Sequence, residues 1–166
     1  NINFILRPGD KTALIGQNDI QTTALIRALM GDIEYEGTVK WGVTTSQSYL
    51  PKDNTRDFDT NKSILDWLRQ FASKEEDDNT FLRGFLGRML FSGDEVNKPV
   101  NVLSGGEKVR VMLSKLMLLK SNVLVLDDPT NHLDLESISS LNDGLKTFKE
   151  SIIFASHDHE FIQTLA

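Results

Sequence analysis

Two apolar runs that each end in polar, chemically active residues most constrain the fold of this chain. "NVLVLDDP", residues 122–129, is apolar until it reaches two carboxylates and a proline, and "SIIFAS", residues 151–156, is followed by His157. A short apolar run without alternation is typical of a strand buried on both faces of a parallel sheet. Helical periodicity lies before and between these runs, so the sequence predicts an α/β fold with a mainly parallel central sheet.

The other elements are predicted from periodicity and turn residues. Ile2, Phe4 and Leu6 alternate with polar positions, and "RPGD" at 7–10 fits a type II turn before a second strand over 12–15. Short strands over 34–42 and 44–50 complete a small antiparallel sub-sheet near the beginning. Helices are expected over 24–30, 63–71, 81–90, 105–119 and from about 135 onward, with Gly31 capping the first of them.

Composition excludes several classes of protein. The 166 residues, 39% of them hydrophobic, suit one compact domain, and a net charge of −6 disfavours a nucleic-acid surface. The absence of cysteine excludes disulfides and thiolate metal sites, and no apolar run is long enough to cross a bilayer. We expect a cytoplasmic protein, and the start without methionine in an apparent strand suggests a fragment of a longer chain.

The segment "GQNDIQTT" has the position of a phosphate-binding loop, between a predicted strand and a predicted helix. The start of a helix presents free N–H groups and a partial positive charge to an anion. The residues predicted to contact phosphate there are Gly16, Gln17, Asn18, Asp19, Ile20, Gln21, Thr22 and Thr23.

A second anion site is predicted at "LSGGE". Ser104 and Glu107 form a capping box at the start of a helix, and Gly105 and Gly106 let an anionic group approach the backbone closely. By itself, the same pattern also fits a simple helix cap followed by a turn.

The carboxyl ends of the two buried strands carry the residues expected to perform chemistry. Ligands of open parallel sheets bind at this edge, where Asp127 suits Mg²⁺ and Asp128 could polarise a water molecule. His157 could contact a terminal phosphate. The simpler interpretations are a strand-ending turn for the two carboxylates and a structural histidine.

Taken together and in order, these motifs resemble the nucleotide-binding domain of an ATP-binding cassette (ABC) protein. The order is the phosphate loop, Gln47 in "TSQSY", the signature "LSGGE", "LVLDD", "NHLD" and His157. The segments "PTNHLDLES", "LSGGEKVRVMLSKL" and "FLRGFLGRMLFSGDEV" resemble the corresponding sequences of the soluble ABC-F group, and in particular those of its second cassette. Members of that group carry two cassettes on one chain and act as translation factors on the ribosome.

The resemblance implies one ABC ATPase domain over 1–166, with a nucleotide-binding core over 1–61 and 119–166 and a helical subdomain over 62–118. It implies ATP and Mg²⁺ as cofactors, with Thr23, Gln47 and Asp127 holding Mg²⁺. Asp128, His157 and Gln47 would be catalytic. The implied partners are a second cassette, which shares the nucleotide across an ATP sandwich, and the ribosome.

The phosphate loop departs from the family pattern G-x-N-G-x-G-K-[ST]-[ST]. Asp19 and Gln21 stand in place of glycines and Thr22 in place of the lysine. In "LVLDD", Asp128 stands where the family usually has the catalytic glutamate. Losing a cation and gaining an anion weakens nucleotide binding by several kcal/mol, at roughly 1.5–3 kcal/mol for each charged hydrogen bond. We therefore expect slow ATP hydrolysis at this domain's own nucleotide site. We expect its signature to complete the nucleotide site of the partner cassette.

Two alternatives stay open. One is a catalytically weak nucleotide-binding or scaffolding half, which Thr22 and Asp128 favour. The other is the ATP-binding subunit of an ABC transporter, which would need a surface groove for a membrane coupling helix.

Overall fold

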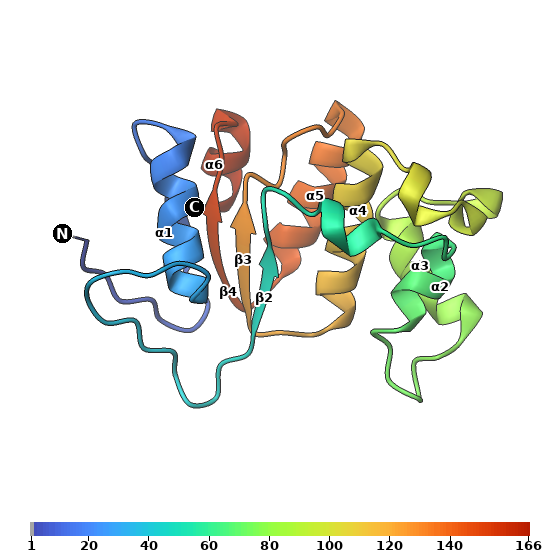
Figure 1. The fold of residues 1–166 in the computed structure, drawn as a ribbon, viewed down its shortest axis with the longest axis horizontal. Coiled ribbons are helices and arrows are strands. Elements are labelled where there is room, and N and C mark those ends of the chain that lie inside the picture. The colour runs from blue at the N-terminus through green and yellow to red at the C-terminus, as the bar shows by residue number, and fades with distance from the viewer. Residues whose placement is uncertain (1) are drawn as a thin grey trace.

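A four-stranded parallel sheet forms the centre of the molecule (Figure 1). The computed structural model describes residues 2–166. The strands are β1 (Lys11–Leu14), β2 (Gln47–Leu50), β3 (Val123–Asp127) and β4 (Ser151–Ala155), and their order in the sheet is β1-β4-β3-β2. All three pairings are parallel. The predicted α/β fold with a parallel sheet is confirmed, and every strand delivers its carboxyl end to one edge.

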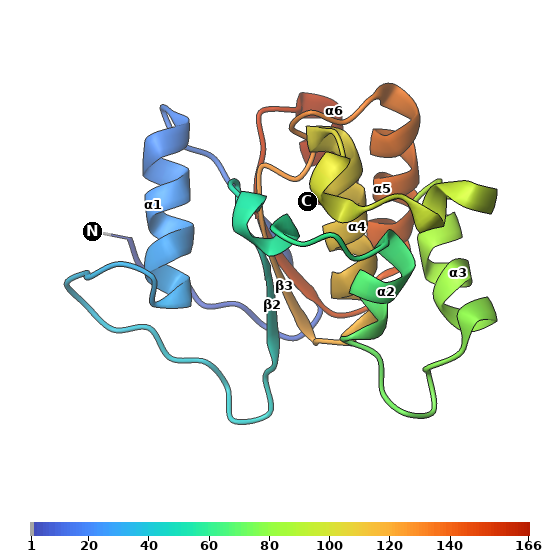
Figure 2. The ribbon, with the colours of Figure 1, turned by 45° about the vertical axis from the view of Figure 1, so that its right-hand side comes forward.

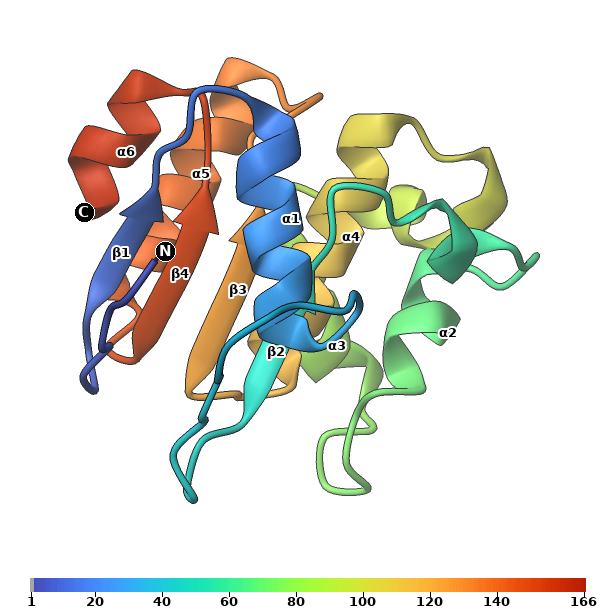
Figure 3. The same cartoon turned by 60° about the vertical axis from the view of Figure 1, so that its left-hand side comes forward.

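Helices cover both faces of this sheet. Figures 2 and 3 show α1 on one side, with α4 and α5 on the other and α2 and α3 further out. The helices are α1 (Asp19–Met30), α2 (Ile64–Arg69), α3 (Asn79–Arg88), α4 (Gly105–Leu118), α5 (Leu135–Thr147) and α6 (His159–Leu165). Three short 3₁₀ helices lie over Thr55–Phe58, Gly93–Asn97 and Val100–Val102.

The two faces of β3 show why its first four residues are apolar. Val123 and Val125 pack with Ile26 of α1, whereas Leu124 and Leu126 belong to the larger core that includes α4 and α5. Successive side chains of a strand point to opposite faces, so a strand covered on both sides needs apolar residues at every position. All five residues of β3 are buried, and those of β4 are buried as well.

Helix α1 begins and ends at residues with clear capping roles. Asn18 accepts a hydrogen bond from the backbone N–H of Gln21, which is an N-cap contact. Gly31 ends the helix in the left-handed region at φ 77°, as the sequence predicted. These caps hold the start of α1 beside the carboxyl ends of the strands.

The outer helices form a packed group around Trp67. Its ring stacks on Phe58 with centroids 5.0 Å apart and meets Phe71 edge-on at 5.0 Å, and its Nε1 donates to the Asp57 carbonyl. Helices α2 and α3 both contact α4. This group positions α4, whose first residues carry the predicted signature.

The antiparallel sub-sheet predicted near the beginning is not formed within residues 2–166. Neither the alternating segment 2–6 nor the segment 34–42 is a strand, and Ile2 and Ile5 are 66% and 88% exposed. Both segments instead line a broad hollow beside α1. Two short antiparallel strands are marginal without a third strand or a covering helix, so alternation alone did not produce strands here.

Along the part of the chain described, no helix combines the length and the apolar character that crossing a lipid bilayer requires.

Candidate functional site

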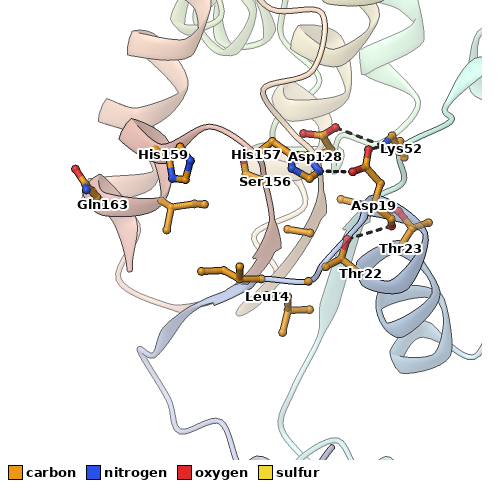
Figure 4. A pocket seen from close by; sticks show the side chains of 15 residues that line it. Leu14, Asp19, Thr22, Thr23, Lys52, Asp128, Ser156, His157, His159 and Gln163 are labelled. Carbon is orange, nitrogen blue, oxygen red and sulfur yellow. Dashed lines mark hydrogen bonds and ion pairs between the residues drawn. The ribbon is translucent and has the colours of Figure 1, made fainter.

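A cavity of about 370 Å³ lies at the carboxyl edge of the sheet, beside the start of α1 (Figure 4). Open parallel sheets bind ligands at this edge, because the strand-following loops meet there. The cavity is lined by Leu14, Ile15, Gly16, Asp19, Thr22, Thr23, Lys52, Asp127, Asp128, Ala155, Ser156, His157, His159, Ile162 and Gln163. The predicted residues Gly16, Asp127 and His157 are therefore gathered at one end of the sheet.

The loop before α1 is short and becomes helical early. Asp19 and Gln21 belong to α1 and have negative φ angles, so neither position needs the backbone freedom of the glycine that the family pattern has there. Gly16 is required for a different reason, because a Cβ on it would lie 2.9 Å from Cγ2 of Thr22. The N-terminus of α1 faces the cavity and offers a partial positive charge to an anion.

Thr23 and Asp127 meet inside the cavity. The Thr23 hydroxyl donates to Oδ1 of Asp127 at 3.1 Å, and Asp127 is 2% exposed. Burial raises the pKa of the Asp127 carboxyl, although the hydrogen bond from Thr23 opposes this. Its other oxygen, Oδ2, has no hydrogen-bond partner among residues 2–166.

A buried carboxylate oxygen without a partner, next to a hydroxyl, fits Mg²⁺. No cluster of three or more His, Cys, Asp or Glu side chains able to hold a metal occurs in the part of the chain that the structure covers. Mg²⁺ is commonly held by one or two carboxylates together with substrate phosphates, so the pair Thr23 and Asp127 suits a metal that arrives with a phosphate ligand.

Asp128 turns toward the same cavity because of its backbone. Two successive strand residues would point to opposite faces, but Asp128 follows the end of β3 and has φ 54°. Its N–H donates to the carbonyl of Ala155 at 2.9 Å, and its side chain is 14% exposed. Aspartate tolerates the left-handed region better than most residues, so this position suits it.

Lys52 is a cavity residue that the sequence analysis missed. Its Nζ lies 2.7 Å from Oδ2 of Asp19 and 3.6 Å from Oδ2 of Asp128, and Figure 4 shows it beside these two carboxylates. The hydrogen bond between Lys52 and Asp19 lowers the pKa of Asp19 and raises that of Lys52. The available signal was position, because Lys52 follows the carboxyl end of β2 by two residues.

His157 follows β4 and faces the cavity from the opposite side. Its Nε2 pairs with Oδ1 of Asp19, so Asp19 contacts both His157 and Lys52. The side chain of His157 is 60% exposed. Ser156, His159 and Gln163 also line the cavity and were not predicted, because Ser156 was counted in the apolar run 151–156 and only His157 was considered after it.

Gln47 does not line the cavity, and its place in the sheet lends no support to its predicted roles in metal binding and catalysis. It is the first residue of β2 and pairs with Val123, the first residue of β3. Asp127 lies four residues further along β3, about 13 Å away at ~3.3 Å per residue. The Gln47 amide instead donates to Oγ1 of Thr45 at 2.7 Å. Gln47 lies at the start of β2, whereas the cavity is lined by Lys52, which follows the end of β2.

The predicted signature lies at the start of α4, outside this cavity. Ser104 and Glu107 form the expected capping box, with Glu107 accepting from the Ser104 N–H at 2.8 Å and Ser104 accepting from the Glu107 N–H at 3.2 Å. A Cβ on Gly106 would lie 2.5 Å from the carbonyl oxygen of His132. This glycine is therefore required by packing within the chain, whatever else it contacts.

Comparison with known proteins gives these residues a family context. The model of the ABC transporter family matches residues 1–131. The chain is 56% identical over 168 residues to the ABC transporter ATP-binding protein YkpA of Bacillus subtilis (strain 168), covering 100% of this chain and 31% of that relative. It is 32% identical over 168 residues to ABC transporter F family member 5 of Arabidopsis thaliana, covering 98% of this chain and 24% of that one.

Solved structures share the fold. A crystal structure of the archaeal ribosomal stalk protein aP1 in complex with the archaeal ribosome recycling factor aABCE1 matches with a TM-score of 0.80 at 22% identity. That match covers 96% of this chain and 31% of the other. The chain thus corresponds to less than a third of the length of YkpA and of this structural neighbour.

Proposed function

The chain is an ATPase domain of the ABC transporter family, and we propose that it serves as one cassette of an ABC-F-type protein that binds ATP and hydrolyses it with Mg²⁺ in the cytoplasm. One observation carries the proposal. The cavity joins the start of α1, with Thr23, to the buried Asp127 and to Asp128 at the ends of the strands. A helix N-terminus for phosphate and a partnerless carboxylate oxygen for Mg²⁺ are the two features that a Mg²⁺-nucleotide needs.

In this proposal each residue has a stated task. The backbone amides at residues 16–23 bind the phosphates, and Thr23 and Asp127 hold Mg²⁺, which would neutralise charge on the phosphate oxygens. Asp128 orients and polarises the attacking water, and His157 contacts the terminal phosphate. The cavity is partly enclosed by α6 and by the segment after β2, and this enclosure limits access of bulk water.

Turnover at this cassette's own site is proposed to be slow. Thr22 replaces the lysine, and its hydroxyl donates to the Asp19 carbonyl at 3.1 Å, so it stabilises the helix start without supplying charge. Asp128 is one methylene shorter than the usual glutamate. Because in-line attack tolerates little displacement of the water, this change reduces the rate further.

The signature residues Ser104–Glu107 are proposed to complete a nucleotide site on a second cassette. They lie outside this chain's own cavity, at the N-terminus of a 14-residue helix that offers positive charge to an anion. The two sites would then be unequal, with this domain supporting the partner's site more than its own.

Steady-state ATP turnover of the full-length protein tests this asymmetry. Ser104→Arg is expected to lower turnover at least about tenfold, whereas Thr23→Ala is expected to have a smaller effect. Asp78→Arg is the control, because Asp78 also caps a helix, α3, but does not line the cavity and lies next to Glu76, which pairs with Lys120 beyond the other end of α4. Equal losses from Ser104→Arg and Thr23→Ala would contradict the unequal division of labour.

A scaffolding role is the second candidate function, favoured by the pairing of Asp19 with Lys52 and His157. Absence of ATP hydrolysis by the intact full-length protein would establish it.

We also propose the ribosome as a partner, on the similarity to the ABC-F group. Co-sedimentation of the full-length protein with ribosomes in the presence of a slowly hydrolysed ATP analogue tests this, and a protein that stays in the supernatant would count against it.

A further inference from the structure

We propose that Lys52 supplies, from the end of β2, the positive charge for nucleotide phosphate that the loop before α1 has lost at Thr22. This inference rests on the proposed binding of ATP in the cavity. It assigns the phosphate-neutralising role to a residue 30 positions away along the chain from the position where a lysine normally stands.

The charge balance of the cavity requires such a group. Among the residues that line it in the described part of the chain, the carboxylates are Asp19, Asp127 and Asp128, whereas Lys52 is the sole lysine or arginine. A triphosphate brought next to three carboxylates needs a cation besides Mg²⁺. Hydrogen bonds between an ammonium and phosphate are among the strong, charge-assisted ones.

The position of Lys52 suits this role. Its Nζ lies 2.7 Å from the Asp19 carboxylate at the first residue of α1 and 3.6 Å from the Asp128 carboxylate after β3. It therefore sits between the helix N-terminus that would bind phosphate and the carboxylate that would polarise water. The side chain is 32% exposed, so its ammonium group can exchange one anionic partner for another.

Asp19 is the competitor for this cation. Its carboxylate bonds Lys52 through Oδ2 and His157 through Oδ1, and so places two anionic oxygens where phosphate oxygens would be bound. A phosphate that binds Lys52 must displace this carboxylate or share the ammonium with it. Asp19 is therefore expected to weaken nucleotide binding, both by repulsion of the phosphates and by engaging Lys52 and His157.

The test is photolabelling of the full-length protein with 8-azido-ATP and Mg²⁺, with labelled peptides from residues 1–166 quantified by mass spectrometry. Lys52→Gln is expected to raise the concentration required for half-maximal labelling about tenfold or more, whereas Lys52→Arg should retain most of the affinity. Asp19→Asn is expected to lower that concentration. Lys62→Gln, an exposed lysine outside the cavity, is the matched control.

The double variant Asp19→Asn/Lys52→Gln separates phosphate binding from simple pairing with Asp19. If Lys52 only neutralised Asp19, the double variant would label as well as Asp19→Asn alone; if Lys52 binds phosphate, it labels about tenfold more weakly than Asp19→Asn. Labelling of the Lys52→Gln variant at the wild-type level, or a double variant equal to Asp19→Asn, overturns the inference. Wild-type protein whose residues 1–166 are not labelled at millimolar probe overturns the proposed ATP site itself, and this inference with it.

Discussion

The hydroxyl of Thr23 donates a hydrogen bond to Oδ1 of Asp127 at 3.1 Å, across 104 residues of sequence. This contact ties the first turn of α1 to the last residue of β3. It satisfies one oxygen of a nearly fully buried carboxylate and leaves Oδ2 without a partner among residues 2–166. A buried polar atom without a partner costs about 1–3 kcal/mol, so this site lowers stability where the proposed Mg²⁺ binding needs a ligand oxygen.

Asp127→Asn is expected to stabilise the fold and remove its chemistry. Burial raises the pKa of Asp127, so the folded state disfavours the charged form, and near neutral pH this carboxylate lowers the free energy of unfolding. The neutral amide keeps an oxygen that accepts from Thr23. We expect a melting temperature higher by about 2–4 °C, with Mg²⁺-dependent binding of ATP lost.

Differential scanning calorimetry and nucleotide titration of the full-length protein check this prediction. Asp143→Asn, at an exposed position of α5, is the control and should leave the melting temperature nearly unchanged. A less stable Asp127→Asn variant would show that the carboxylate is stabilised by contacts not considered above.

Gly106→Ala is expected to destabilise the protein by about 1–3 kcal/mol. The added Cβ would lie 2.5 Å from the backbone carbonyl oxygen of His132, and a backbone atom cannot move aside as a flexible side chain can. Gly105→Ala is the matched control, because its nearest atom is Cγ of His132 at 3.4 Å. Urea unfolding of both variants measures the difference, and equal stabilities would contradict the packing explanation.

The central elements could be predicted from the sequence because their signals are local and agree with one another. The run over 123–126 is apolar at every position and buried on both faces, and Ser104 with Glu107 forms a capping box at the start of α4. Residues that end or follow parallel strands lie at the same carboxyl edge of the sheet, so Asp127, Asp128 and His157 were predicted to lie close together from the strand pattern alone.

The remaining features depend on contacts that local patterns do not encode. The alternation of Ile2 and Phe4 predicted a strand, but a strand also needs a partner to bind its backbone, and none lies beside these residues in the described chain. Gln47 was chosen by motif order, and the direction of β2 places it at the start of the strand, away from the edge where Asp127 lies. Lys52 was missed because its role is visible only when Asp19 and Asp128 are seen around it.

Gly144→Ala and Gly31→Ala are expected to change stability in opposite directions. Gly144 lies inside α5 with no atom within 4 Å of an added Cβ, so alanine should stabilise by about 0.5–1 kcal/mol. Gly31 has equally open space but φ 77°, where alanine costs about 1–2 kcal/mol. Thermal melts of the two variants provide the measurement, and a shift of the same sign in both would refute this explanation from backbone conformation.

Glu107→Gln is expected to make the protein less stable near pH 7 but not in acid. Burial raises the pKa of the Glu107 carboxyl, but the hydrogen bond from the Ser104 N–H and the pairing with Lys98 together outweigh it, so the pKa is lowered. A lowered folded-state pKa contributes stability above the ordinary glutamate value, and this contribution is lost as the pH falls through the folded-state value. Glutamine can keep the capping box, so the loss near pH 7 should be limited to the charge, about 0.3–1 kcal/mol at a helix N-terminus.

Urea unfolding of the wild type and Glu107→Gln at about pH 7, pH 5 and pH 3 measures this dependence. The difference in unfolding free energy should persist at about pH 5 and shrink toward about pH 3, because the Glu107 carboxylate becomes protonated as the pH falls through its lowered folded-state pKa. Glu36→Gln, at an exposed position, is the control and should show little difference at any pH. A difference that grows on acidification would mean that the Glu107 carboxylate destabilises the start of α4, and that its interactions with Ser104 and Lys98 fail to offset its burial.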